Sequence, residues 1–225
     1  MTVSVVCLDA ADTLFTERTS RAELYVETLS NHGVTVDRET MAVWMGEAHD
    51  ALPPRIDGQP RYSDAWFRSF VAYLLKRAGS SGDAEGIRAE LADVFTSAGN
   101  YVVFGDTFPA LDDLLESGYR LAIVSNWSPR LEGLMHDLGL LHYFEILAVS
   151  AVVGVDKPDP SLFHYALQRL DANPAEAVHV GDHLQNDVAG AQAAGLRAFH
   201  LDRETVGGPE SLSSLLELRE RIADA

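Results

Sequence analysis

The sequence predicts an α/β protein in which one parallel sheet forms the core and a set of helices is inserted into it. The short apolar run at residues 3–8 lacks the polar alternation of a half-exposed strand, so we expect it to be buried on both faces. Residues 19–100 carry apolar side chains at helical spacing. After residue 105, strand-like and helix-like segments alternate, which is typical of parallel βαβ units.

The helical stretch follows the first predicted strand directly. Its apolar residues recur at helical spacing around residues 24–29, 41–45 and 66–75. The segment PPRIDGQP at residues 53–60 divides the stretch into two predicted helical pairs, because Pro and Gly interrupt helices. Arg55 lies in that break, and we expect it to grip a substrate if the loop faces the core.

The second half of the chain is expected to alternate regularly between strands and helices. Strands are predicted at residues 120–125, 145–150, 177–180 and 197–201. Helices are predicted at residues 107–117, 130–138, 160–170, 187–194 and 211–222.

The position of the insertion predicts two domains. A lone strand cannot bury itself, so residues 3–8 must pair with the later strands. The helical stretch therefore interrupts a discontinuous domain. We predict a Rossmann-like core of residues 1–16 and 101–225, with an α-helical cap of residues 17–100.

The composition excludes some classes of partner. Lys and Arg number 17 against 34 Asp and Glu, which gives a formal charge of -17. Such a surface repels phosphate backbones and anionic lipids, so we expect no nucleic-acid partner and no membrane partner. The N-terminus lacks a secretory pattern, no segment is apolar enough to span a membrane, and Cys7 has no disulfide partner, which together indicate a cytoplasmic protein. Whether the chain is a monomer or a homodimer is left open.

Polar side chains follow the predicted strands at the points where the strands end. These residues are Asp9, Ser125, Asn126, Lys157, Asp182 and Asp187. The carboxyl ends of parallel strands meet at one edge of a sheet, so the residues should converge there. Three crowded carboxylates repel one another unless a hard cation such as Mg²⁺, which prefers oxygen ligands, lies among them. A lysine and a hydroxyl beside that cation would complete a receptor for a phosphoryl group.

Four short segments around these residues resemble the motifs of the haloacid-dehalogenase superfamily. LDAADTL at residues 8–14 is similar to the first motif, DxDGT[LV], and VSN at 124–126 to the second. KPD at 157–159 is similar to the third motif, and GDHLQND at 181–187 to the fourth. Each segment alone is weak evidence, but all four occur in the family's order. The helical insertion resembles the cap of the phosphoglycolate-phosphatase-like subfamily.

The resemblance implies a role for each residue. Asp9 would be the nucleophile that forms an aspartyl-phosphate. Ser125, Asn126 and Lys157 would bind the phosphoryl group, and Lys157 would also orient Asp9. Asp182 would bind Mg²⁺ together with Asp9 and the backbone carbonyl of Ala11, with support from Asp187 directly or through water. The implied substrate is a small phosphorylated metabolite.

The first motif departs from the family pattern at its third residue. Phosphatases of the family carry a second Asp there as general acid and base, whereas this chain has Ala11, followed by Asp12 where the pattern has Gly. Loss of general acid–base help typically slows a reaction by ~10²–10⁴-fold. A similar DT segment occurs in a branch of haloacid-dehalogenase-like hydrolase-domain proteins. Asp12 could take over the proton transfer, turnover could be slow and limited to good leaving groups, or the site could bind without catalysis.

We therefore predict an Mg²⁺-dependent phosphatase that is slow or narrow in its substrates. One alternative is a catalytically impaired protein that binds phosphate or metal, and Ala11 is the feature that favours it. A second alternative is a dehalogenase of the superfamily, which also uses one Asp and no second acid. Those enzymes work without a metal, so Asp182 and Asp187 argue against that alternative.

Overall fold

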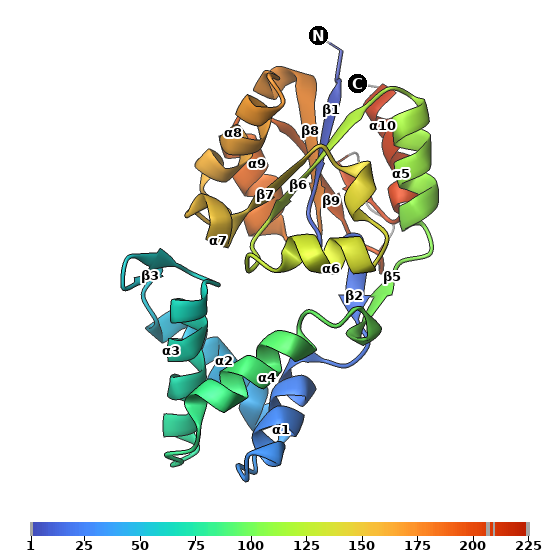
Figure 1. The fold of residues 1–225 in the computed structure, drawn as a ribbon. Coiled ribbons are helices and arrows are strands. Elements are labelled where there is room, and N and C mark those ends of the chain that lie inside the picture. The colour runs from blue at the N-terminus through green and yellow to red at the C-terminus, as the bar shows by residue number, and fades with distance from the viewer. Residues whose placement is uncertain (1, 206–207, 209, 224–225) are drawn as a thin grey trace.

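A six-stranded parallel sheet lies in the upper part of Figure 1 and forms the core of the chain outside the inserted helices. The computed structural model describes residues 2–205, 208 and 210–223. The strand order is β10-β9-β8-β1-β6-β7, so the first strand lies between two strands that come more than a hundred residues later. The strands are β1 (Val5–Leu8), β6 (Arg120–Ser125), β7 (Ile146–Val149), β8 (Ala177–Gly181), β9 (Arg197–Leu201) and β10 (Ser211–Leu212). This arrangement confirms the predicted α/β class and the pairing of the first strand with later ones.

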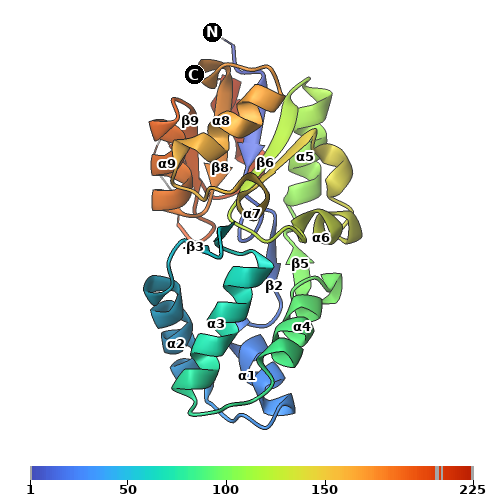
Figure 2. The same cartoon turned by 60° about the vertical axis from the view of Figure 1, so that its left-hand side comes forward.

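Helices cover both faces of the sheet (Figures 1 and 2). Successive residues of a strand point to opposite faces, so Val6 and Leu8 join one apolar cluster while Val5 and Cys7 join the other. The first cluster includes side chains of α5 (Thr107–Glu116), α6 (Leu131–Asp137) and α10 (Leu218–Ala223). The second includes side chains of α8 (Pro160–Arg169) and α9 (Gly190–Ala193), with α7 (Ser150–Val153) between β7 and α8. All four β1 residues are therefore fully buried.

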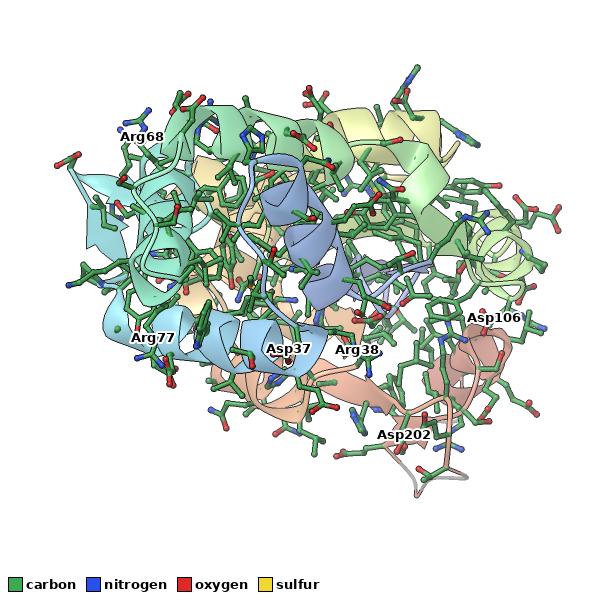
Figure 3. All side chains as sticks on the ribbon, turned by 90° about the horizontal axis from the view of Figure 1, so that it is seen from below. Asp37, Arg38, Arg68, Arg77, Asp106 and Asp202 are labelled. Carbon is green, nitrogen blue, oxygen red and sulfur yellow. The ribbon has the colours of Figure 1, made fainter. Side chains whose placement is uncertain are left out.

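The inserted segment forms four helices with an apolar cluster of their own. They are α1 (Arg21–Asn31), α2 (Arg38–Ala51), α3 (Asp64–Arg77) and α4 (Ala84–Val94), with a short hairpin of β3 (Arg55–Ile56) and β4 (Gln59–Pro60) between α2 and α3. Each helix begins after a residue whose side chain accepts a backbone N–H of the first turn: Ser20, Asp37, Ser63 and Asp83. Figure 3 views this insertion from below, with Asp37 and Arg38 where α2 begins.

Two strands connect the insertion to the sheet. β2 (Phe15–Glu17) leaves the core and β5 (Tyr101–Val103) returns to it, and the two pair in an antiparallel ribbon (Figure 1). A further contact between the parts is the ion pair of Arg130 and Asp64, whose nitrogen and oxygen lie 2.8 Å apart. The division into core and cap stays a proposal, consistent with the separate apolar clusters.

Most predicted elements differ from the structure by a residue or more at their ends, and three of these differences change the type of element or its first turn. Residues 211–212 form an edge strand rather than the start of a helix, because the Ser214 side chain caps a 3-10 turn that precedes α10. Ser150 begins α7 instead of ending β7. The helix predicted from residue 187 begins at residue 184, as a π-helical turn η4 (Leu184–Ala189) that runs into α9. In the described part of the chain, no helix has the length and apolar character needed to cross a membrane.

Candidate active site

Acidic and basic side chains meet beyond the carboxyl ends of β1 and β8, where they come from these strand ends, from η4 and from the loop between α7 and α8. The Lys157 ammonium nitrogen lies 2.8 Å from Asp9 Oδ1 and 2.5 Å from Asp187 Oδ1. One carboxylate oxygen from each of Asp9, Asp182 and Asp187 lies within 4.8 Å of the other two. The structure therefore gathers four of the residues that the sequence motifs singled out.

The three carboxylates fit a hard divalent cation. Burial, followed by the negative charges of Asp9, Asp187 and Asp12, raises the pKa of Asp182 to about 6. Burial also raises the pKa of Asp9, against the opposing effect of Lys157. A cation among these oxygens would offset the repulsion and keep both carboxylates ionised, and oxygen is the donor that Mg²⁺ prefers. The donor set thus suits Mg²⁺ better than a softer metal.

Asp187 is fixed by three partners. Its Oδ1 contacts Lys157 and, at 2.9 Å, His179 Nε2, while its Oδ2 accepts the backbone N–H of His183 at 3.0 Å. Burial would raise the pKa of the Asp187 carboxyl, but Lys157 and His179 hold it below its ordinary value. Asp187 in turn keeps the buried Lys157 charged, because it and Asp9 raise the pKa of that ammonium against the effect of burial.

Asn126 holds the main chain of Lys157. Its amide oxygen accepts the Lys157 backbone N–H at 2.7 Å, and its amide nitrogen donates to the Lys157 carbonyl at 3.0 Å. The Asn126 side chain therefore positions Lys157. Ser125 ends β6 and is almost completely buried. Both residues keep their predicted phosphate-binding roles as proposals.

The loop after β1 explains why Asp12 can stand where the family has Gly. Asp12 has φ +55°, in the left-handed region that glycine adopts freely and that Asp tolerates better than most residues. Its carboxylate is exposed and accepts the Thr16 hydroxyl at 2.7 Å. The guanidinium of Arg203, which is paired with Asp106, donates to the Thr13 carbonyl at 2.8 Å and ties this loop to the end of β9.

Some side chains were missed or differently placed by sequence reasoning. His179 was missed, although a histidine inside the apolar strand AVHV is an unusual residue that could have drawn attention. Arg55 donates to the carbonyls of Gly58 and Gly154, so it fastens the β3–β4 hairpin to α7 and the expectation that it grips substrate finds no support.

Gly181 is required for the position of Asp187. A Cβ added at residue 181 would overlap the Cβ, Cγ and Oδ2 of Asp187. We expect Gly181→Ala to push that carboxylate away from Lys157 and His179, with a loss of roughly 1–3 kcal/mol in stability from overpacking and at least about tenfold lower kcat. Thermal unfolding and phosphatase assays measure the two effects. Gly133→Ala is the control, because a Cβ there meets nothing within 4 Å; equal behaviour of the two variants would contradict the prediction.

Comparison with known proteins defines the class to which this fold and site belong. The haloacid dehalogenase-like hydrolase family matches residues 3–195, most of the chain. The chain belongs to the haloacid dehalogenase-like hydrolase family. It is therefore a hydrolase, and its relatives include enzymes named as phosphatases.

Individual relatives agree with this assignment. The chain is 33% identical over 216 residues to haloacid dehalogenase-like hydrolase domain-containing protein 3 of Mus musculus, covering 92% of this chain and 82% of that protein. It is 35% identical over 142 residues to a phosphoserine phosphatase of Thermus thermophilus, covering 62% and 57% respectively. The crystal structure of a 2-haloacid dehalogenase from Pseudomonas syringae pv. Tomato superposes with a TM-score of 0.72 at 26% identity, covering 99% of both chains.

Proposed function

We propose that this protein hydrolyses a phosphate monoester in a Mg²⁺-dependent reaction, through an aspartyl-phosphate on Asp9. The observation that carries the proposal is the cluster of the Asp9, Asp182 and Asp187 carboxylates, in which Asp9 and Asp187 pair with the Lys157 ammonium. The cluster lies at the edge of the sheet where ligands of such folds bind. The phosphatase names among the relatives support the same reaction class.

In the proposed first step, the phosphoryl group is transferred from the ester to Asp9, and several residues each have a role. A carboxylate oxygen of Asp9 attacks phosphorus, the bond from phosphorus to the ester oxygen breaks, and the leaving oxygen keeps the electron pair. Lys157 orients Asp9 and neutralises phosphoryl charge, and the Ser125 hydroxyl donates to a phosphoryl oxygen. Because Ala11 carries no proton, the leaving oxygen must take its proton from water.

The second step releases the phosphoryl group from Asp9. A water molecule attacks phosphorus, the bond between phosphorus and the Asp9 oxygen breaks, and inorganic phosphate leaves. We propose that the exposed Asp12 carboxylate accepts the proton of this water, since it is the remaining carboxylate of the first motif. Its hydrogen bond with Thr16 would then have to yield to the water.

The residues that would hold Mg²⁺ are Asp9, Asp182 and the backbone carbonyl of Ala11, with Asp187 supporting them. When bound, the ion supplies positive charge that stabilises the phosphoryl oxygens in the transition state. The helices α1–α4 would act as a cap that keeps bulk water away from the phosphoryl group. The proposed substrate is a small phosphorylated compound.

Two other functions compete with the phosphatase, namely binding without catalysis and a metal-free dehalogenase reaction, and different observations favour each of them. Ala11 favours a catalytically impaired protein that only binds phosphate or Mg²⁺. The structural likeness to a 2-haloacid dehalogenase favours the metal-free reaction, yet the gathering of Asp182 and Asp187 beside Asp9 is the arrangement that a cation site needs. We therefore place the phosphatase first.

Metal removal tests the proposal directly. We expect release of p-nitrophenol from p-nitrophenyl phosphate to stop with excess EDTA and to return when Mg²⁺ is added. Asp182→Asn should raise the Mg²⁺ concentration needed for half-maximal activity by at least about tenfold, because one anionic ligand is lost. Asp137→Asn, at a mostly exposed carboxylate in α6, is the matched control. Activity that persists in EDTA, or equal Mg²⁺ requirements in both variants, would contradict the metal-dependent mechanism.

A further inference from the structure

A cavity of about 360 Å³ lies between the inserted helices and the core. Eight of the 17 residues that line it are Phe, Tyr or Trp, although such residues make up only 8% of the chain. Among the residues that the structure describes, none of its lining is Asp or Glu, in a chain with 34 of them. Arg21, Arg130 and His49 supply its basic groups. The cavity is therefore aromatic and free of negative charge.

The cap side of the cavity is a continuous row of aromatic rings. Going from Phe95 through Tyr25, Phe70 and Trp66 to Tyr62, successive ring centroids lie 5.4, 5.8, 5.3 and 5.7 Å apart. Such spacings are those of stacked and edge-on aromatic pairs, and a further ring can join the row with the same geometry. The row runs from α1 and α3 to the loop after α4.

The core side of the cavity carries Trp127 and Tyr101, whose ring centroids lie 6.4 Å apart. Between the two sides stands Arg21, with its guanidinium carbon 5.5 Å from the Trp127 ring centroid and 5.6 Å from that of Phe95. Arg21 is also paired with Glu17. The cavity thus has aromatic surfaces on both sides and one guanidinium over two of the rings.

The cavity adjoins the candidate active site through one loop. Trp127 directly follows Asn126, which also lines the cavity and whose side chain holds the main chain of Lys157. The Lys157 ammonium lies 2.8 Å from Asp9. On the cap side, Tyr62 has φ +65°, which strains the backbone of a bulky residue. That strained turn sets the Tyr62 ring against Trp66, in the wall of the cavity.

The chemistry of the first motif restricts what can leave from this site. Without an acid at Ala11, the ester oxygen must depart unprotonated. A phenol such as that of tyrosine has a pKa of about 10, whereas the pKa of an aliphatic alcohol lies far higher, close to that of water. An aryl oxygen therefore leaves without help far more readily than an alkyl oxygen.

We propose that the cavity binds the aromatic part of an aryl phosphate monoester, so that the substrate class is a phosphorylated phenol with one or two fused rings. This inference rests on the proposed phosphatase reaction at Asp9. In that reaction the bond from phosphorus to the aryl oxygen breaks, the phenolate leaves with the electron pair, and water supplies its proton. The aromatic surroundings and the missing acid, two independent features of the chain, favour the same leaving group.

The test compares two substrates with good leaving groups, of which only one is aromatic. Acetyl phosphate has a small acidic leaving group, and 1-naphthyl phosphate has two fused rings. We expect the KM for 1-naphthyl phosphate to be about 10- to 100-fold lower than that for acetyl phosphate. The naphthyl group would bury about as much apolar area as one large apolar side chain, and the free energy of that burial corresponds to such a factor. Equal KM values would overturn the inference but leave the phosphatase reaction standing.

A variant pair then localises the effect. Gly46 lines the cavity, and a Cβ there meets nothing within 4 Å, so Gly46→Leu should narrow the cavity without a backbone clash. Gly133→Leu places the same side chain on the exposed surface of α6. We expect Gly46→Leu to raise the KM for 1-naphthyl phosphate at least about tenfold more than that for acetyl phosphate, and Gly133→Leu to change neither. A uniform change for both substrates in Gly46→Leu would overturn the inference.

Calorimetry separates the cavity from the reaction. Titration of 1-naphthyl phosphate into Asp9→Asn protein with Mg²⁺ measures binding in the absence of turnover. If 1-naphthyl phosphate binds and Gly46→Leu weakens this binding, the result supports the cavity as the binding site. That support holds even if the wild-type protein hydrolyses neither substrate, since such a lack of hydrolysis would refute only the proposed reaction. Absence of binding, or binding that Gly46→Leu leaves unchanged, would overturn the cavity assignment.

Discussion

Asp9→Asn is expected to reduce Mg²⁺-dependent phosphatase activity by at least about 10³-fold, as removal of a catalytic nucleophile does elsewhere. Asn has nearly the same shape as Asp, but its amide is not a nucleophile. Because the amide is uncharged, it also loses the ion pair by which Lys157 orients Asp9. Steady-state kinetics with p-nitrophenyl phosphate measures the loss. The effect should fall on kcat, because the amide can still occupy the space beside the phosphoryl group.

The fold should survive this change. Asp9, Asp182 and Asp187 repel one another in the absence of a cation, so removal of one charge relieves the cluster, while Lys157 keeps Asp187 as its partner. We therefore expect the thermal unfolding temperature of the metal-free variant to match or exceed that of the wild type. Asp137→Asn serves again as the control for the chemical change. Full activity of Asp9→Asn would remove Asp9 from the mechanism.

Ala11→Asp should raise turnover by at least about tenfold, toward the ~10²–10⁴-fold that general acid–base catalysis typically contributes. The new carboxyl would protonate the leaving oxygen and later accept a proton from the attacking water. The gain should be larger for alkyl phosphates than for p-nitrophenyl phosphate, because p-nitrophenolate leaves without a proton. A comparison of kcat for glycerol phosphate and p-nitrophenyl phosphate measures this difference.

Ala11→Asn is the matched control for this gain of activity. It adds nearly the same volume and polarity to the half-buried position but cannot transfer a proton in the same way. A gain confined to Asp identifies the missing acid as the limiting feature. Equal gains in both variants would point to better packing of the loop, and no gain would leave Asp12 as the proton acceptor already in use.

The sequence predicted the elements of the core and their order with few errors. Buried strands read as unbroken apolar runs, whereas the capping residues of the inserted helices, such as Ser20 and Ser63, were identified only in the structure. Errors fell at element ends such as residues 211–212, because the side-chain contacts of Ser214 decide where a helix starts there. Periodicity carries no information about such contacts.

The sequence predicted which residues belong to the candidate site, but not the hydrogen bonds between them. Asp9, Lys157, Asp182 and Asp187 could be grouped because the carboxyl ends of parallel strands share one edge of the sheet. Asn126 is hydrogen-bonded to the main chain of Lys157, and His179 to the carboxylate of Asp187. The sequence pattern does not predict in which direction these side chains point. Their catalytic roles remain predictions.

The sequence by itself determined the class of the sheet, the place of the insertion and the residues at the strand ends, because these follow from periodicity and from order along the chain. Only the tertiary structure decided that Arg55 fastens a hairpin, that Gly181 leaves room for Asp187, and that aromatic residues of distant helices enclose one cavity. The physical reason is that such contacts depend on how elements pack against each other, which is a property of three-dimensional distances rather than of spacing in the chain.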